Sequence, residues 1–173
     1  MFNIRIIYDS RETFQSQSKA GFHNDHQSIN NIMSIYNAIE CKGYNCSLFG
    51  GVNELIRAYD NKESFSHNDL FLNLSDGMTQ EYSRVQIPIL CDLLGVKYSG
   101  GGPFTVALST NKYYSVMAAQ KIGVPVANSV LVLNNIFPDE LSLSKLKFPI
   151  IIKPNSKGSS IGISKENICH TKE

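Results

Sequence analysis

The chain has 173 residues, of which 42% are hydrophobic and 18% charged, and its formal net charge is +1. This length suits one ordinary domain, or a small domain with part of a second, and the composition is typical of a globular protein. A charge so close to zero excludes the basic surface with which proteins bind nucleic acids or anionic membranes. The sequence has neither a transmembrane-length apolar stretch nor a signal peptide, and its four cysteines form no CxxC pair. We therefore expect a cytoplasmic protein with free thiols and no metal site.

The first half of the chain predicts alternating strands and helices. Apolar runs of strand length alternate with stretches that have the apolar period of a helix. In chain order, these are a strand at 2–8, a helix at 28–42, a strand at 44–49, a short helix at 52–59 and a strand at 69–74. This order predicts a parallel sheet with right-handed crossovers. The polar loops after the first and third strands would lie at its carboxyl edge, where open α/β sheets bind ligands.

The second half predicts further elements and a domain boundary. The glycine run at 100–102, followed by Pro103, is typical of a linker, so we expect one domain at 1–101 and another at 102–173. The expected elements are a helix at 87–94, a short strand at 96–98, a helix at 111–122, a strand at 126–133, a loop with a short helix at 134–147 and a strand at 148–153. Residues 161–164 are expected to pair back onto that last strand as a hairpin.

The segment FPIIIKPNSKGSSIGIS, at 148–164, carries the strongest chemical signal. Lys153 ends an apolar strand that we expect to be buried, where an ammonium group is costly unless an anion lies beside it. The loop that follows contains glycines and serines, which let backbone N–H and hydroxyl donors approach an anion closely. This combination predicts a site for the phosphates of a nucleotide.

Two other interpretations of the same loop stay open. The first is a surface hairpin with an incidental lysine. The second is the nucleophile elbow of a serine hydrolase, because Gly158, Ser160 and Gly162 fit G-x-S-x-G. An elbow needs an apolar strand directly before its first glycine and a helix after its second. Here the mostly polar stretch 153–157 precedes Gly158, and this stretch disfavours the interpretation as a serine hydrolase. The chain also contains no Walker A sequence.

The order of an apolar strand, Lys-Pro, three polar residues and Gly-Ser-Ser-x-Gly resembles the ATP-grasp ligases, and among them the D-alanine–D-alanine ligases. Three upstream segments follow that family's order: YSG at 98–100, ALSTNK at 107–112 and GVPV at 123–126. The resemblance covers the chain from about residue 69 onward and, more loosely, 2–49. It implies an α/β fold with a parallel-sheet, Rossmann-like pre-ATP-grasp domain, followed by the first α+β subdomain of an ATP-grasp fold, which would be incomplete.

The resemblance also implies an activity and a set of site residues. The family uses ATP and Mg²⁺ to form an acyl phosphate, which the amine of a second amino acid attacks. Lys112 and Lys153 would contact the nucleotide phosphates, and Ser159 and Ser160 would be catalytic. The expected nucleotide site consists of Lys112, Lys153, Gly158, Ser159, Ser160 and Gly162. The two serines and the two glycines of this set would form a lid over the phosphates. The magnesium ligands are expected beyond Glu173, so that this chain alone would be inactive.

The loops that would bind the first amino acid depart from the family pattern. Asn24 occupies the position of the usual acidic residue, and Asp25 and Asp76 are the candidates to bind the substrate. Lys157 replaces a glutamate that is common in the lid. The implied partners are amino acids and ATP, and the family often dimerises through its N-terminal domain. The alternative is a truncated or degenerate ATP-grasp fragment that acts as a binding or assembly module without catalysis.

Overall fold

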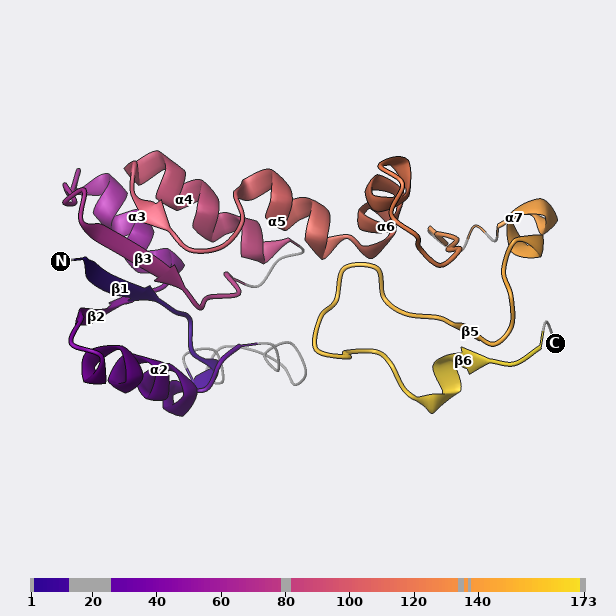
Figure 1. Ribbon diagram of the computed structural model, residues 1–173, viewed down its shortest axis with the longest axis horizontal. Helices are drawn as coiled ribbons and strands as arrows, with labels where there is room; N and C mark the ends of the chain where they lie inside the picture. The colour runs from indigo at the N-terminus through magenta and orange to yellow at the C-terminus, as the bar shows by residue number, and fades with distance from the viewer. Residues whose placement is uncertain (1, 13–25, 79–81, 134–135, 137, 172–173) are drawn as a thin grey trace. The chain divides into compact units, whose positions relative to one another are not determined.

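The computed structural model describes residues 2–12, 26–78, 82–133, 136 and 138–171. The chain divides into two compact units, Met1–Ala107 and Leu108–Glu173 (Figure 1). The first unit contains a parallel sheet with helices, and the second contains short helices and a two-stranded antiparallel sheet. The predicted mixed α/β class is confirmed.

The sheet of the first unit has the strand order β2-β1-β3-β4, and all of its pairings are parallel. Ile4, near the middle of the central strand β1, pairs with Cys46 on one side and with Leu70 on the other. The four strands are β1 (Asn3–Ile7), β2 (Asn45–Gly50), β3 (Asp69–Asn73) and β4 (Lys97–Tyr98). The chain moves outward from β1 to β2 and then crosses back to β3, so the strand order reverses beside β1.

The helices of this unit cover both faces of the sheet. In Figure 1, α2 lies on one side, and α3 and α4 lie on the other. The helix predicted at 28–42 is α2: Ser28 caps it through a hydrogen bond from the Asn31 amide, and Gly43, with φ of +82°, follows its end. The unit's helical elements are α2 (Ile29–Cys41), α3 (Val52–Asp60), the 3-10 turn η1 (Ser83–Val85), α4 (Gln86–Leu94) and α5 (Pro103–Thr110), which runs past the unit's last residue. Helix α5 begins at Pro103, directly after the glycine run at 100–102, and proline suits the first position of a helix.

The apolar core of the first unit lies between the sheet and the helices α3 and α4. Its buried members are Ile7, Val52, Leu55, Phe71, Ile87 and Cys91. Phe71 is fully buried, and the rings of Phe49 and Phe65 pack edge-on against it at centroid distances of 5.1 and 5.2 Å. The core therefore holds β1 and β3 in place beneath the loops that follow them.

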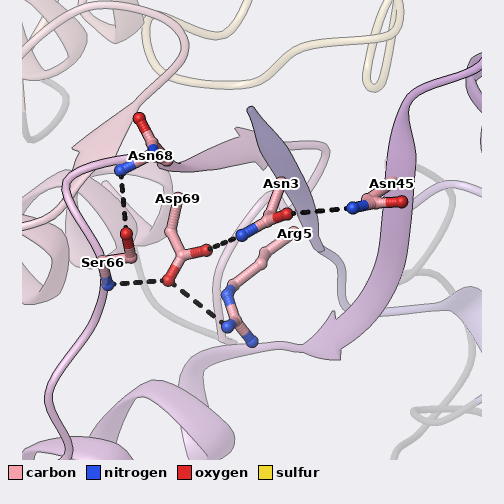
Figure 2. A network of polar contacts seen from close by, with 6 residues as sticks. All are labelled: Asn3, Arg5, Asn45, Ser66, Asn68 and Asp69. Atoms are coloured by element: carbon pink, nitrogen blue, oxygen red, sulfur yellow. Dashed lines mark hydrogen bonds and ion pairs between the residues drawn. The ribbon is translucent and has the colours of Figure 1, made fainter. Parts of the chain in front are cut away.

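A polar network joins β1 and β3 at the amino ends of these strands (Figure 2). Asp69, which is only 3% exposed, accepts hydrogen bonds from Asn3 Nδ2 at 3.0 Å, Arg5 Nη2 at 3.3 Å and the Ser66 amide at 2.9 Å. Burial by itself would raise the pKa of Asp69, but these hydrogen bonds and the Arg5 charge outweigh it and lower the pKa. The buried carboxylate is therefore ionised and paired.

The second unit contains fewer strands than the sequence predicts. Its elements are α6 (Lys112–Lys121), α7 (Glu140–Ser144), β5 (Ile150–Ile151), the 3-10 turn η2 (Lys165–Asn167) and β6 (Ile168–Cys169). The helix predicted at 111–122 and the short helix within 134–147 are confirmed. The strand predicted at 126–133 is wrong, since the described part of that segment forms only an isolated bridge between Leu133 and Ile136. Strand propensity alone does not make a strand where no neighbour pairs with it.

The hairpin predicted for this unit is also wrong in its partner. β5, which is shorter than the predicted strand at 148–153, pairs antiparallel with β6, in a stretch for which the sequence predicts no element. Residues 161–163 instead lie within two overlapping tight turns, at 158–161 and 160–163, because Ser159, Ser160 and Gly162 have positive φ and turn the backbone away from an extended conformation. The loop between β5 and β6 thus runs from Ile152 to Asn167.

Candidate functional site

The start of helix α6 is fastened to the loop that follows Lys153. Asn111 is the N-cap of α6, and its Oδ1 accepts a hydrogen bond from the Tyr114 amide at 3.0 Å. Asn155 accepts the two preceding amides, through its backbone oxygen from Lys112 at 3.1 Å and through its Oδ1 from Tyr113 at 2.9 Å. All three amides of the first helical turn therefore have an acceptor.

The side chain of Lys112 reinforces this attachment. Its Nζ donates to the backbone oxygen of Asn155 at 3.2 Å and to the backbone oxygen of Lys157. A lysine in the first turn of a helix faces the positive end of the helix dipole, which is unfavourable. The two carbonyl groups offset that repulsion and bring the Lys112 ammonium to the base of the predicted lid.

Lys153 follows β5 and is exposed. The backbone leading to it is held by a hydrogen bond from the Ile152 amide to the Asn167 oxygen at 2.8 Å. Among the described residues, the Lys153 ammonium has no hydrogen-bond or ion-pair partner. Ile151 and Ile152 are 50% and 60% exposed, so the expectation of a buried strand is wrong, and desolvation does not by itself call for an anion here. The role of Lys153 stays a prediction.

The two lid serines form a tight turn. The Ile161 amide donates to the Gly158 oxygen at 2.9 Å, and the central residues Ser159 and Ser160 have φ of +48° and +58°. Positive φ at both central positions is the pattern of a type I′ turn, which non-glycine residues adopt at a cost. Both serines are exposed, so their hydroxyls are accessible to a ligand.

A second turn closes the loop. The Ile163 amide donates to the Ser160 oxygen at 3.1 Å, and Gly162 has φ of +74°. A Cβ at Gly162 would lie 2.9 Å from Pro154 Cγ, so a side chain does not fit there. In the described chain after Gly162, a 3-10 turn and β6 come next instead of the helix that a nucleophile elbow requires.

The two substrate-binding candidates differ in what the structure describes. Asp25 lies outside the described residues. Asp76 lies in the loop after β3, where its Oδ1 accepts from Arg84 Nε at 2.7 Å and its backbone oxygen accepts from Ser83 Oγ at 2.7 Å. The Asp76 carboxylate is thus paired with a guanidinium group, and binding of a substrate ammonium there stays a prediction.

A buried carboxylate that the sequence analysis did not single out lies at the carboxyl edge of the sheet. Asp9, 8% exposed, accepts a hydrogen bond from Ser75 Oγ, which itself accepts the Gly77 amide at 2.9 Å. A Cβ on Gly51 would lie 1.9 Å from Asp9 Oδ1, so the carboxylate packs directly against the backbone where α3 begins. Burial raises the pKa of Asp9, although the Ser75 hydroxyl and the Val52 amide oppose this. The position of Asp9 directly after an apolar strand could have revealed it.

The described residues contain neither a candidate metal site nor a candidate membrane span. Among the residues that the structure describes, no group of three or more His, Cys, Asp or Glu side chains could hold a metal ion. Within the same ranges, no helix has both the length and the apolar character needed to cross a membrane.

The fold and the loop define a class of protein. A parallel α/β unit precedes a second unit that carries Lys-Pro and a turn of Gly-Ser-Ser-x-Gly, the arrangement expected for the amino-terminal part of a D-alanine–D-alanine ligase-like protein. No protein-family model matches the chain.

The chain is 34% identical over 73 residues to a D-alanine–D-alanine ligase of Actinobacillus pleuropneumoniae, covering 42% of this chain and 24% of that protein. It is 33% identical over 106 residues to a D-alanine–D-alanine ligase of Corynebacterium jeikeium, covering 60% and 27%. In fold it matches the crystal structure of a D-alanine–D-alanine ligase of Bacillus anthracis with a TM-score of 0.65 and 20% identity, over 99% of this chain and 50% of that one. The chain is therefore D-alanine–D-alanine ligase-like, and it spans about a quarter of the curated relatives it matches.

Proposed function

We propose that this chain supplies the amino-terminal part of an ATP-dependent ligase that joins the carboxylate of one amino acid to the amine of another. The observation that carries this proposal is the sequence similarity, at 33–34% identity, to D-alanine–D-alanine ligases. The first part would be the pre-ATP-grasp domain, at 1–101, and the second, at 102–173, would be the start of the nucleotide-binding domain.

The proposed reaction has two steps. The first amino acid's carboxylate oxygen attacks the γ-phosphorus of ATP, which forms an acyl phosphate and releases ADP. The amine of the second amino acid then attacks the acyl carbon, the C–O bond to phosphate breaks, and the amine loses a proton as the peptide bond forms. Phosphoryl transfer needs charge neutralisation more than covalent help from the protein, so lysines are the expected catalytic aids.

The proposed roles come from the family resemblance, and the site geometry is compatible with them. Lys153 has an ammonium without a partner among the described residues, and it would bind a phosphate directly. Lys112, whose ammonium contacts two backbone carbonyl oxygens, would also contact a phosphate oxygen, because attraction between opposite charges adds to the hydrogen bond when both partners are ionised. The exposed hydroxyls of Ser159 and Ser160 would close over the transferred phosphate, and Gly158 and Gly162 would allow the turn to approach it.

Other parts of the proposal rest on the family resemblance. Asp25 and Asp76 would lie near the first amino acid. Mg²⁺, which neutralises the phosphates in this class of reaction, would be held by carboxylates, and we assign no step to it because the described residues gather no such group. The protein would act in the cytoplasm, as a homodimer joined through its first unit.

The test is ADP release by the protein with ATP, Mg²⁺ and pairs of amino acids, D-alanine among them. The proposal predicts ADP release that depends on an amino acid and is lost in Lys153→Ala. ATP binding without ADP release in the full natural protein would instead support a binding module. Absence of ATP binding would refute both.

A further inference from the structure

One residue fastens the loop after Lys153 to helix α6. Asn155 contributes three interactions with residues more than 40 positions earlier: Oδ1 with the Tyr113 amide at 2.9 Å, and its backbone oxygen with Lys112 N at 3.1 Å and Lys112 Nζ at 3.2 Å. From these contacts we infer that Asn155 is a positioning residue, which sets Lys153 and the serine turn at a fixed place relative to Lys112. This inference rests on the proposed nucleotide-binding function.

Asn155 lies between the two parts of the loop that the contact would position. It lies two residues after Lys153 and three residues before Gly158, between the proposed phosphate-binding lysine and the lid. Lys112, which Asn155 contacts, is the second proposed phosphate ligand. All of these residues belong to the second unit, so the contact sets the spacing of two cations within one compact body. Phosphate binding by two cations depends on that spacing.

The side-chain contact is not required to begin helix α6. Asn111 already occupies the N-cap, accepts the Tyr114 amide and, through its backbone oxygen, the Ser115 amide at 2.9 Å. Tyr113 is the remaining donor that only Asn155 Oδ1 accepts, among the hydrogen bonds of the described residues. Removal of the Asn155 side chain should therefore weaken the attachment of the loop, which the Asn155 backbone oxygen still maintains in part, while α6 stays folded.

The chemistry of the contact needs an oxygen acceptor at this side-chain length. Asn155→Ala removes the acceptor, whereas Asn155→Asp keeps it and suits the positive end of a helix. Loss of one neutral hydrogen bond would lower the equilibrium constant for the fastened loop about 5- to 10-fold, and the apparent affinity for nucleotide would fall by up to the same factor, reached when the variant loop is mostly open.

Asn128→Ala is a matched control in the same unit. The Asn128 side chain also makes one hydrogen bond to the backbone, from Nδ2 to the Lys145 oxygen at 2.7 Å, at the end of α7. Asn128→Ala removes the same amide group, and the hydrogen bond that it breaks involves no residue of the loop at 153–162.

The experiment has two readouts on the full chain. In the ligand-free protein, amide hydrogen exchange at Tyr113 should accelerate in Asn155→Ala, stay near the wild-type rate in Asn155→Asp and not change in Asn128→Ala. In a titration with ATP, Asn155→Ala should bind more weakly than wild type, by up to about 5- to 10-fold, and Asn128→Ala should bind as tightly as wild type.

The outcomes separate the inference from the proposed function. Unchanged exchange at Tyr113 in Asn155→Ala would overturn the fastening. Faster exchange with unchanged ATP affinity, in a protein whose wild type binds ATP, would overturn the positioning role and leave the proposed function standing. A wild-type protein that does not bind ATP would overturn the proposed function and the positioning role with it.

Discussion

Replacement of Asp69 by alanine tests whether the polar network at the amino ends of β1 and β3 stabilises the first unit. The change leaves Asn3, Arg5 and the Ser66 amide without their common acceptor in a site that is 3% exposed. Each of the two hydrogen bonds from an uncharged donor, the Asn3 amide group and the Ser66 amide, contributes at least about 1 kcal/mol. The charged pair is worth about the same after discounting for solvent, because the Arg5 side chain is 34% exposed. The expected loss is about 3 kcal/mol.

The assay is urea and thermal unfolding, followed by circular dichroism, of wild type and Asp69→Ala. A loss of about 3 kcal/mol in a unit of this size lowers the melting temperature by more than about 10 °C. Asp60→Ala is the matched control, because Asp60 is exposed at the end of α3, and its replacement should change stability by less than about 0.5 kcal/mol.

The pH dependence gives the same prediction an independent check. The pKa of Asp69 is lower in the folded protein than in the unfolded chain, so its contribution is fully present above the unfolded pKa near 3.8 and is lost as pH falls through the folded pKa. Wild type should therefore lose more stability than Asp69→Ala on acidification below pH 4. A loss of less than about 1 kcal/mol at pH 7, or equal acid sensitivity of the two proteins, would refute the reasoning.

Three further predictions concern the first unit. Gly51→Ala should destabilise it by about 2 kcal/mol or more, seen as a lower urea midpoint, because the added Cβ would lie 1.9 Å from Asp9 Oδ1; an unchanged midpoint would contradict this close packing. Burial raises the folded pKa of Asp9, so ionisation of Asp9 costs stability as pH rises through that pKa, and Asp9→Asn should remove this loss in unfolding measured across pH. Cys91 is fully buried and its pKa is raised to about 12, so iodoacetamide at pH 8 should modify exposed Cys41 and spare Cys91 until the protein unfolds, by mass spectrometry of peptides. Equal labelling of the two cysteines would contradict the packing.

The sequence predicts the first unit well because its signals are local and strong. Ser28 and Gly43 mark the limits of α2, and the apolar runs that become β1 and β3 have the length and composition of buried strands. The reversal of strand order beside β1 follows from pairing between strands, and it cannot be read from one segment alone.

The second unit was predicted less well because its strands depend on partners. Residues 126–133 have strand propensity but form no strand in the described part, whereas the two-residue strand Ile168–Cys169 exists because it pairs with β5. Exposure of Ile151 and Ile152 likewise depends on what packs against them.

For the candidate site, the motif identified the loop but not its attachment. The Lys-Pro and Gly-Ser-Ser-x-Gly sequence indicated Lys153 and the serine turn, and the resemblance indicated Lys112. The role of Asn155 could not be predicted from the sequence, because its contacts are with residues 42 and 43 positions earlier in the chain. The contact between Asp9 and Ser75 likewise depends on the tertiary structure, because it joins the end of β1 to the loop after β3.

The affinity for ATP of wild type, Lys153→Ala and Lys165→Ala tests the central claim, that the loop after β5 binds nucleotide phosphates, most directly. Lys165 is an exposed lysine in η2 of the same unit and serves as the matched control. A lost charge-assisted hydrogen bond of about 1.5–3 kcal/mol predicts that Lys153→Ala binds roughly 10- to 100-fold more weakly, while Lys165→Ala binds like wild type. Equal affinity of all three proteins, or no binding by any of them, would contradict the claim.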